Sequence, residues 1–254
     1  WTMRFFKLLT IYKRIKEIVF QIGYINTVIL LFHRILIKLF SGKLRIYKYY
    51  LTAQPVTNQT LLPPNRGKKI TVKQISRDDP IVSAFPRPDS IIKSRFDTGA
   101  VCLVALKENV FVGYIWFMLG AYQEDEVRAK FVPLPASATV WDFDIYVHPD
   151  YRLGHTFLRL WDEANRFLLD RKIEWSCSRI SAFNAPSINV HTKLGALNLG
   201  QVIFFCIGSC QLTLATLFPY IHVSTHLNSY PTFFIDTQKN NTIFPMKGKE
   251  STTE

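Results

Sequence analysis

Residues 139–147 show the clearest alternation of apolar and polar positions in the chain. Successive side chains of a strand point to opposite faces, so this alternation predicts a strand. One face would pack into a core through Trp141, Phe143, Ile145 and Val147. The other face would carry Asp142, Asp144 and Tyr146. Two carboxylates are therefore expected on the same, outer face of this strand.

A turn and a helix are expected after this strand. Pro149 ends the strand because proline lacks the N–H that a ladder needs. Apolar residues then return at helical spacing: Phe157, Leu160, Trp161, Ala164, Phe167 and Leu168. The free N–H groups and the positive dipole end at the start of a helix attract anions, and Arg152 adds a charge in the turn. The sequence predicts an anion site here.

Shorter apolar runs predict the other elements. The expected strands are residues 44–51, 69–75, 100–106, 110–119 and 174–181, with one or two more in 201–218. A helix is expected at 185–194, where Asn184 is a good cap and Pro186 stands in the first turn. Residues 78–97 predict a broken helical region that Pro86 and Pro88 interrupt. Strands and helices mixed in this order indicate an α+β fold.

The N-terminal segment has a helical seam of ten apolar residues at spacings of three and four: Leu8, Ile11, Ile15, Ile18, Ile22, Ile25, Ile29, Phe32, Leu36 and Leu39. A break is expected near Gly23 or Asn26. Residues 18–32 carry no charge, but this run is shorter than the roughly 20 residues that span a bilayer. Three interpretations stay open for residues 1–42. They could form a hairpin packed on the rest of the chain, an oligomerisation seam, or a helix that lies on an anionic membrane surface.

Charge and cysteine content narrow the functional classes. The chain has 254 residues and a net charge of +12, and residues 1–50 supply +9 of it through ten basic side chains against Glu17. The remainder is nearly balanced, which argues against nucleic acid as a partner. The four cysteines form no CxxC pair, so buried free thiols in a reducing cytoplasm are expected. His148 and His155 lack a supporting ligand cluster, so no metal site is expected.

The composition divides the chain into four parts. We expect a basic helical extension with a strand at 1–53 and a turn-rich linker at 54–68 that contains Pro55, Pro63, Pro64 and Gly67. The main folded domain would occupy 69–237. A polar, disordered tail is expected at 238–254.

Two motifs at a suitable separation resemble the GNAT superfamily of N-acetyltransferases. The run Val147-His148-Pro149-Asp150-Tyr151-Arg152 matches the end of the strand and the turn of that superfamily's motif A. Its motif B is matched by Asn184, Ser187, His191, Lys193, Leu194 and Gly195. The resemblance implies a mostly antiparallel, splayed sheet with helices on both faces, and an acyl transfer from acetyl-CoA to an amine-bearing acceptor.

The resemblance also implies which residues hold acetyl-CoA. The carbonyl and the pantetheine arm would lie along the backbone of Ile145, Tyr146 and Val147. The pyrophosphate would lie at the turn, against Arg152, Leu153, Gly154, His155, Thr156 and Phe157. Asn184 and Ser187 would complete the site from motif B. One departure stands out, because the only glycine of the turn, Gly154, sits one place earlier than in the superfamily pattern.

The implied reaction is direct attack in a ternary complex. Asp142 or Asp144 would take the proton of the acceptor amine if burial raises its pKa. His191 stands where the superfamily often has a tyrosine and would give a proton to the thiolate; a satisfied buried histidine is the alternative. A coenzyme A-binding module without catalysis and a membrane-surface scaffold remain the rival functions. The acceptor, the acyl chain length and the oligomeric state stay open, and a cytoplasmic or peripheral membrane location is expected.

Overall fold

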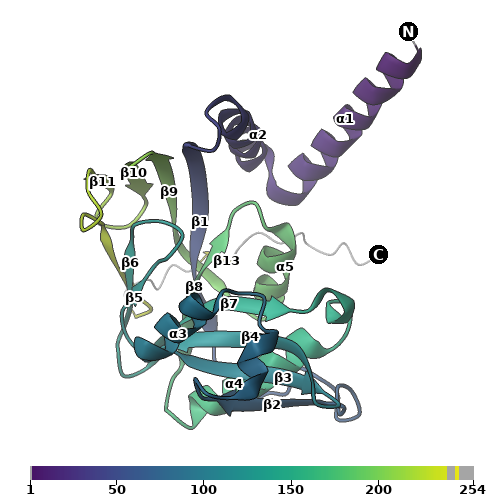
Figure 1. Ribbon diagram of the computed structural model, residues 1–254, viewed down its shortest axis with the longest axis vertical. Helices are drawn as coiled ribbons and strands as arrows, with labels where there is room; N and C mark the ends of the chain where they lie inside the picture. The colour runs from purple at the N-terminus through teal and green to yellow at the C-terminus, as the bar shows by residue number, and fades with distance from the viewer. Residues whose placement is uncertain (1, 239–243, 246–254) are drawn as a thin grey trace.

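The computed structural model describes residues 2–238 and 244–245, with side chains from residue 9 to residue 238. Its main sheet has ten strands, of which nine run in the order β11-β10-β9-β1-β8-β7-β4-β3-β2, while β13 pairs with β9 (Figure 1). Neighbouring strands are antiparallel except β7 and β8, which are parallel. The prediction of an α+β fold with a mostly antiparallel sheet is confirmed.

The strands of the main sheet are β1 (Leu44–Pro55), β2 (Ile70–Ile75), β3 (Val101–Lys107), β4 (Val110–Met118), β7 (Thr139–Val147), β8 (Trp175–Ser181), β9 (Leu197–Ile207), β10 (Cys210–Ala215), β11 (Ile221–Ser224) and β13 (Phe244–Pro245). A second, three-stranded sheet has the order β12-β6-β5. It joins β5 (Tyr122–Gln123), β6 (Lys130–Leu134) and β12 (Thr232–Asp236). This small sheet was not predicted, because its strands are short and β6 and β12 come from distant parts of the chain.

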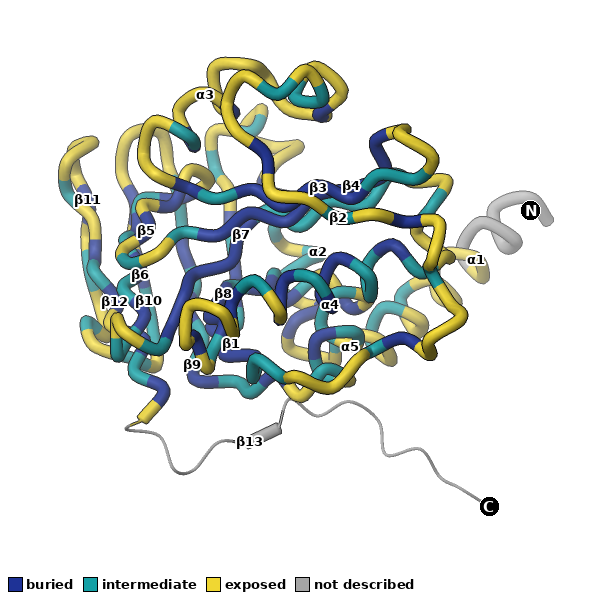
Figure 2. Tube along the Cα trace, turned by 90° about the horizontal axis from the view of Figure 1, so that it is seen from below, coloured by how far each residue is buried: buried dark blue, intermediate teal, exposed yellow. Residues whose placement is uncertain are grey.

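Helices cover both faces of the main sheet (Figure 2). On one side lie α4 (Thr156–Leu169) and α5 (Ala185–Lys193), and on the other lies α3 (Asp89–Asp97) after the short 3₁₀ helix Pro80–Ala84. A further 3₁₀ turn, Pro149–Tyr151, joins β7 to α4. Apolar side chains line the inner face of α4 and pack on the sheet, as its helical spacing predicted.

Strand β1 lies in the middle of the main sheet, between β8 and β9. The domain prediction had placed it with the N-terminal extension, so a unit beginning at residue 69 would lack a central strand. Most of the tail expected at 238–254 lies outside the described residues. The exceptions are Gln238 and the two residues of β13.

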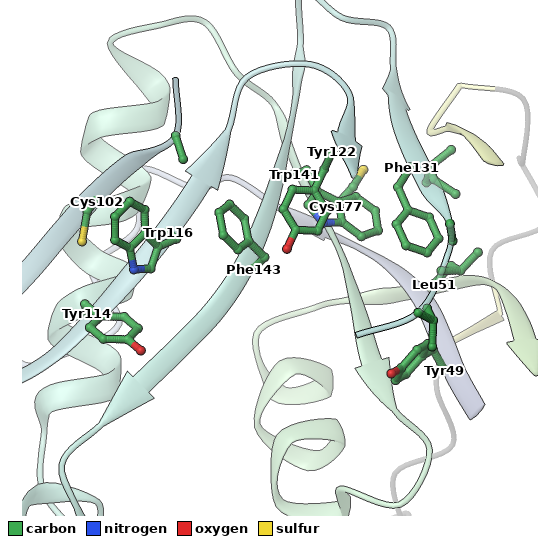
Figure 3. Close-up of a cluster of buried hydrophobic side chains, with 14 of the residues drawn as sticks. Tyr49, Leu51, Cys102, Tyr114, Trp116, Tyr122, Phe131, Trp141, Phe143 and Cys177 are labelled. Carbon is green, nitrogen blue, oxygen red and sulfur yellow. The ribbon is translucent and has the colours of Figure 1, made fainter. Parts of the chain in front are cut away.

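Two large apolar clusters form most of the core, one on each face of the sheet, and a small third cluster joins Ile180 and Ala196. The cluster on the α3 side is rich in aromatic rings, including Trp116, Trp141 and Phe131 (Figure 3). Rings of Phe131 and Trp141 stack with centroids 4.6 Å apart. The cluster on the α4 side is mainly aliphatic and includes Trp161. All four cysteines are free. Cys102 and Cys177 are buried as expected, whereas Cys206 is only partly buried and Cys210, the first residue of β10, is exposed.

Helices α1 (Thr2–Ile22) and α2 (Tyr24–Leu39) meet at Gly23, which adopts a φ of 80° that suits glycine. The predicted break at this position is confirmed. Helix α2 contacts β1, while α1 projects away from the sheets (Figure 1). Among the described helices, none combines the length and the apolar character needed to cross a membrane.

Candidate functional site

The two central parallel strands separate after only three residue pairs. Strands β7 and β8 pair from Thr139 to Trp141, and from Asp142 onward that edge of β7 has no partner strand among the described residues. A cavity of about 1000 Å³ occupies the gap. Its walls come from the second half of β7, the turn before α4 with the first residues of α4, β8, and α5.

A β-bulge at Asp144 decides which way the side chains of β7 point. The pairing with β4 shifts register between Tyr114 and Trp116, and Asp144 takes a φ of 51°. The bulge adds a residue and so reverses the alternation. Trp141, Phe143 and Tyr146 therefore pack in the core on the α3 side, and Ile145 and Val147 pack on the α4 side. The prediction that Trp141, Phe143, Ile145 and Val147 share one core face was wrong. It assumed that side chains alternate strictly along the whole strand, and the bulge interrupts this alternation.

Gly113 of β4 pairs with Val147, just beyond this bulge. A Cβ at Gly113 would lie 2.5 Å from the backbone oxygen of Tyr146. This is shorter than any ordinary contact, so only glycine allows β4 and β7 to pair this closely beyond the bulge.

The two carboxylates on β7 have opposite environments. Asp144 accepts hydrogen bonds from Arg87, Arg95 and Tyr114, with Arg95 Nη1 2.6 Å from Oδ2. Burial would raise its pKa, but the hydrogen bonds from Arg87 and the charge of Arg95 prevail and hold the pKa of Asp144 below its usual range. Asp144 is therefore a permanent anion that anchors two arginines.

Asp142 is buried and has no basic partner among the described residues. Burial raises its pKa to about 7, although the hydroxyls of Ser176 and Ser178 oppose the shift. Ser176 Oγ donates to Asp142 Oδ2 at 2.7 Å across the point where the strands separate. Ser178 Oγ lies 3.1 Å from the hydroxyl of Thr52. A carboxyl group with this pKa exchanges a proton readily near neutral pH.

His191 lies at the inner wall of the cavity and is buried. Its Nδ1 is 2.8 Å from Oε1 of Gln54, and its ring meets the rings of Phe157 and Trp161 edge-on. Burial lowers its pKa to about 4, so the imidazole is neutral at pH 7. A neutral imidazole is a weak proton donor, and the geometry favours the alternative of a satisfied buried histidine.

The turn between β7 and α4 presents an open helix terminus. No side chain caps α4, whose N-cap residue is His155. The hydroxyl of Thr156 is buried without a hydrogen-bond partner among the described residues. The Arg152 side chain donates from Nε to the oxygen of Val147 at 3.1 Å, which leaves the other guanidinium nitrogens available to a ligand. The open terminus of α4 and the Arg152 guanidinium can together bind an anion.

The cavity brings together most of the predicted site residues. Those that line it are Asp142, Asp144, Ile145, Tyr146, Val147, Arg152, Gly154, Phe157, Asn184, Ser187 and His191. Leu153 is fully exposed at the turn, and neither Leu153, His155 nor Thr156 lines the cavity. Asn184 caps α5 by accepting a hydrogen bond from the Ser187 N–H at 3.1 Å. Among the described residues, no group of three metal-binding side chains is close enough to hold an ion.

A second cavity of about 600 Å³ adjoins the first on the α3 side, and both are lined by Asp142 to Ile145. Sequence reasoning missed its charged residues. Arg179 donates to Glu124 through two nitrogens, at 2.7 and 2.8 Å, and also contacts Glu126. Tyr49 donates its hydroxyl to Glu126. These residues come from separate elements, so no local motif marks them.

Comparisons with known proteins give matches in structure only. No family model matches the sequence, and no curated protein matches it. A functionally unknown protein from Staphylococcus epidermidis has 12% identity and a TM-score of 0.47 over 68% of this chain and 66% of its own. A tandem GNAT protein from the clavulanic acid biosynthesis pathway has 15% identity and a TM-score of 0.45, over 63% of this chain and 53% of its own. The chain thus covers less than two thirds of either protein.

An aminoglycoside acetyltransferase solved with a coenzyme A bisubstrate analogue has 18% identity and a TM-score of 0.37, over 50% of this chain and 89% of its own. The similar solved structures therefore include a protein described as GNAT and an aminoglycoside acetyltransferase. At these identities and TM-scores, the chemistry has to be inferred from the geometry of the site itself.

Proposed function

We propose that this protein transfers an acyl group, most simply acetyl, from a coenzyme A thioester to an amine. The observation that carries the proposal is the position of Asp142. Its carboxyl group has a pKa of about 7 and lies where the two cavities meet, at the gap between β7 and β8. A base at this junction can reach ligands in both cavities.

The larger cavity suits coenzyme A. The unpaired edge of β7 offers backbone N–H and C=O groups to the pantetheine arm, which is a chain of amides. The open terminus of α4, together with Arg152, suits the pyrophosphate. Lys193 on the opposite wall adds a second positive charge. The amine-bearing acceptor would enter through the smaller cavity.

Asp142 is the proposed general base, and Asp144 is not. A base has to release and take up a proton near the working pH, which Asp142 can do with a pKa of about 7. Asp144 is already committed to Arg87 and Arg95 and stays ionised. Its proposed role is to fix the positions of these arginines at the wall of the acceptor cavity.

The proton balance of the transfer needs one group only. As the amine nitrogen bonds to the thioester carbonyl carbon, Asp142 takes the proton that the nitrogen loses. The carbon–sulfur bond then breaks, and the protonated Asp142 returns the proton to the thiolate, since thiols have a higher pKa than this carboxyl. His191 would act as a positioning residue that supports Phe157 and the first turn of α4.

Two measurements test the proposal. Calorimetric titration should show coenzyme A binding, and release of free thiol from acetyl-CoA should depend on an added amine. Asp142→Asn should lose at least about a hundredfold in turnover while coenzyme A affinity stays within about twofold. Binding without any amine-dependent thiol release would favour the coenzyme A-binding module. No binding at millimolar ligand would refute both functions.

A further inference from the structure

Helix α2 carries an apolar stripe that faces away from the rest of the protein. Its members are all exposed: Tyr24, Ile25, Val28, Phe32, Ile35 and Leu39. At 3.6 residues per turn these six side chains fall within an arc of roughly 100°. Their exposed fractions range from 48% for Val28 to 73% for Tyr24. A continuous apolar surface of this kind marks an interaction site rather than scattered surface residues.

The opposite side of α2 is held to the sheet by polar contacts. Asn26 donates to Tyr50 Oη at 2.9 Å and accepts from Lys48 Nζ at 2.8 Å. The His33 Nδ1 accepts from the Ile46 N–H at 3.0 Å. These bonds fix the rotation of α2 about its axis, so the apolar stripe does not turn towards the core.

Basic residues lie along one edge of the stripe. Arg34 and Lys38 both follow this edge on α2, and the exposed Lys43 and Arg45 come after the helix ends. The chain has no acidic residue between Glu17 and Asp78. Helix α1 continues the same composition, with Lys13, Arg14 and Lys16 all exposed. The partner of this surface must therefore be both apolar and negatively charged.

We propose that the apolar stripe of α2 docks in the plane of an anionic lipid bilayer, with the basic residues along its edge at the lipid phosphates. An anionic bilayer surface is both apolar and negatively charged. Its acyl chains would contact the apolar stripe, and its anionic headgroups would neutralise the basic residues beside the stripe. A second copy of the chain fits less well, because its matching stripe would bring further basic residues and no nearby acidic residue to neutralise Arg34 and Lys38.

Co-sedimentation of the full chain with vesicles tests this docking. The protein should pellet with vesicles of phosphatidylcholine and phosphatidylglycerol, remain in the supernatant with phosphatidylcholine alone, and be released by salt. Combined Phe32→Asp and Ile35→Asp should weaken binding at least tenfold. Combined Arg34→Gln and Lys38→Gln should weaken it about thirtyfold, from about 1 kcal/mol for each basic residue near the surface.

A matched control separates docking from general effects of added charge. Ile221→Asp with Val223→Asp places the same charges on exposed apolar residues of β11 and should bind vesicles like the parent. Circular dichroism of each variant should show unchanged helix content and an unchanged melting midpoint. No pelleting with anionic vesicles at low salt would overturn the proposal, and so would equal binding by the Phe32 and Ile35 variant. A dimer in sedimentation velocity that this variant abolishes would assign the stripe to a second copy instead.

Discussion

Ser176 of β8 donates a hydrogen bond to Asp142 of β7 at 2.7 Å, just where the two strands cease to pair. The bond stabilises the ionised carboxyl and so opposes the rise in pKa that burial causes. It connects the geometry of the gap between the strands to the protonation of the proposed base.

We expect the pH dependence of turnover to report this bond. Activity should rise with pH through a midpoint near 7, because Asp142 has to be ionised to accept the proton. Ser176→Ala removes a donor to the carboxylate, so the midpoint should move to higher pH. Thiol release between pH 5.5 and 9 measures it, and an unmoved midpoint in Ser176→Ala would remove Asp142 from the role of base.

Arg152→Ala should weaken coenzyme A binding by about 1.5 to 3 kcal/mol, because a charge-assisted hydrogen bond to a phosphate usually contributes this much to the binding free energy. Calorimetric titration measures the affinity. Arg166→Ala, on the exposed face near the other end of α4, is the matched control and should bind like the parent. Equal affinity in both variants would place the pyrophosphate elsewhere.

Arg95→Met should lower the free energy of unfolding by about 3 kcal/mol, because it leaves the buried Asp144 with one arginine fewer. The Arg95 guanidinium also packs on the rings of Trp116 and Phe143. Arg77→Met breaks the exposed pair with Asp97 and should cost less than about 1 kcal/mol. Urea denaturation compares them, and equal costs would contradict a structural role for the buried pair.

Gly113→Ala should destabilise the protein by about 1 to 3 kcal/mol and reduce coenzyme A affinity, since the added Cβ would displace the backbone of Tyr146. Gly154→Ala meets its nearest atom at 3.3 Å and should change the unfolding energy much less. Thermal melts and titrations of both variants give the comparison. A fully stable Gly113→Ala would show that β4 and β7 have room to separate.

The buried His191 should make stability depend on pH. Its folded pKa of about 4 lies below the unfolded value of about 6.5. The stability that it supplies above pH 6.5 is therefore lost as pH falls to 4, by about 3 kcal/mol. The raised pKa of Asp142 has the opposite effect on stability over this pH range. Asp142 is present in both the parent and His191→Gln, so the difference between their free energies of unfolding isolates the contribution of His191.

That difference should shrink by about 3 kcal/mol between pH 7 and pH 4. A constant difference for His191→Gln would mean that His191 is accessible to protons in the folded protein, which would return it to consideration as a proton donor.

Local sequence patterns determined the elements that surround the site. Alternation and capping residues predicted β7, the turn, α4 and α5 nearly to the residue, because these signals act between neighbours in the chain. Gly23 likewise marked the break between α1 and α2. The predicted cofactor residues from Ile145 to Val147, with Arg152 and Asn184, line one cavity because they follow each other along those elements.

Only the tertiary structure decided the chemistry of the carboxylates. Asp142 and Asp144 are two residues apart and look equivalent in the sequence, yet one is buried beside serines and the other binds two arginines. The bulge at Asp144 belongs to the pairing of β7 with β4, a strand that comes from an earlier part of the chain. A pKa depends on burial and on charges brought from distant segments, and neither is written in the neighbouring residues.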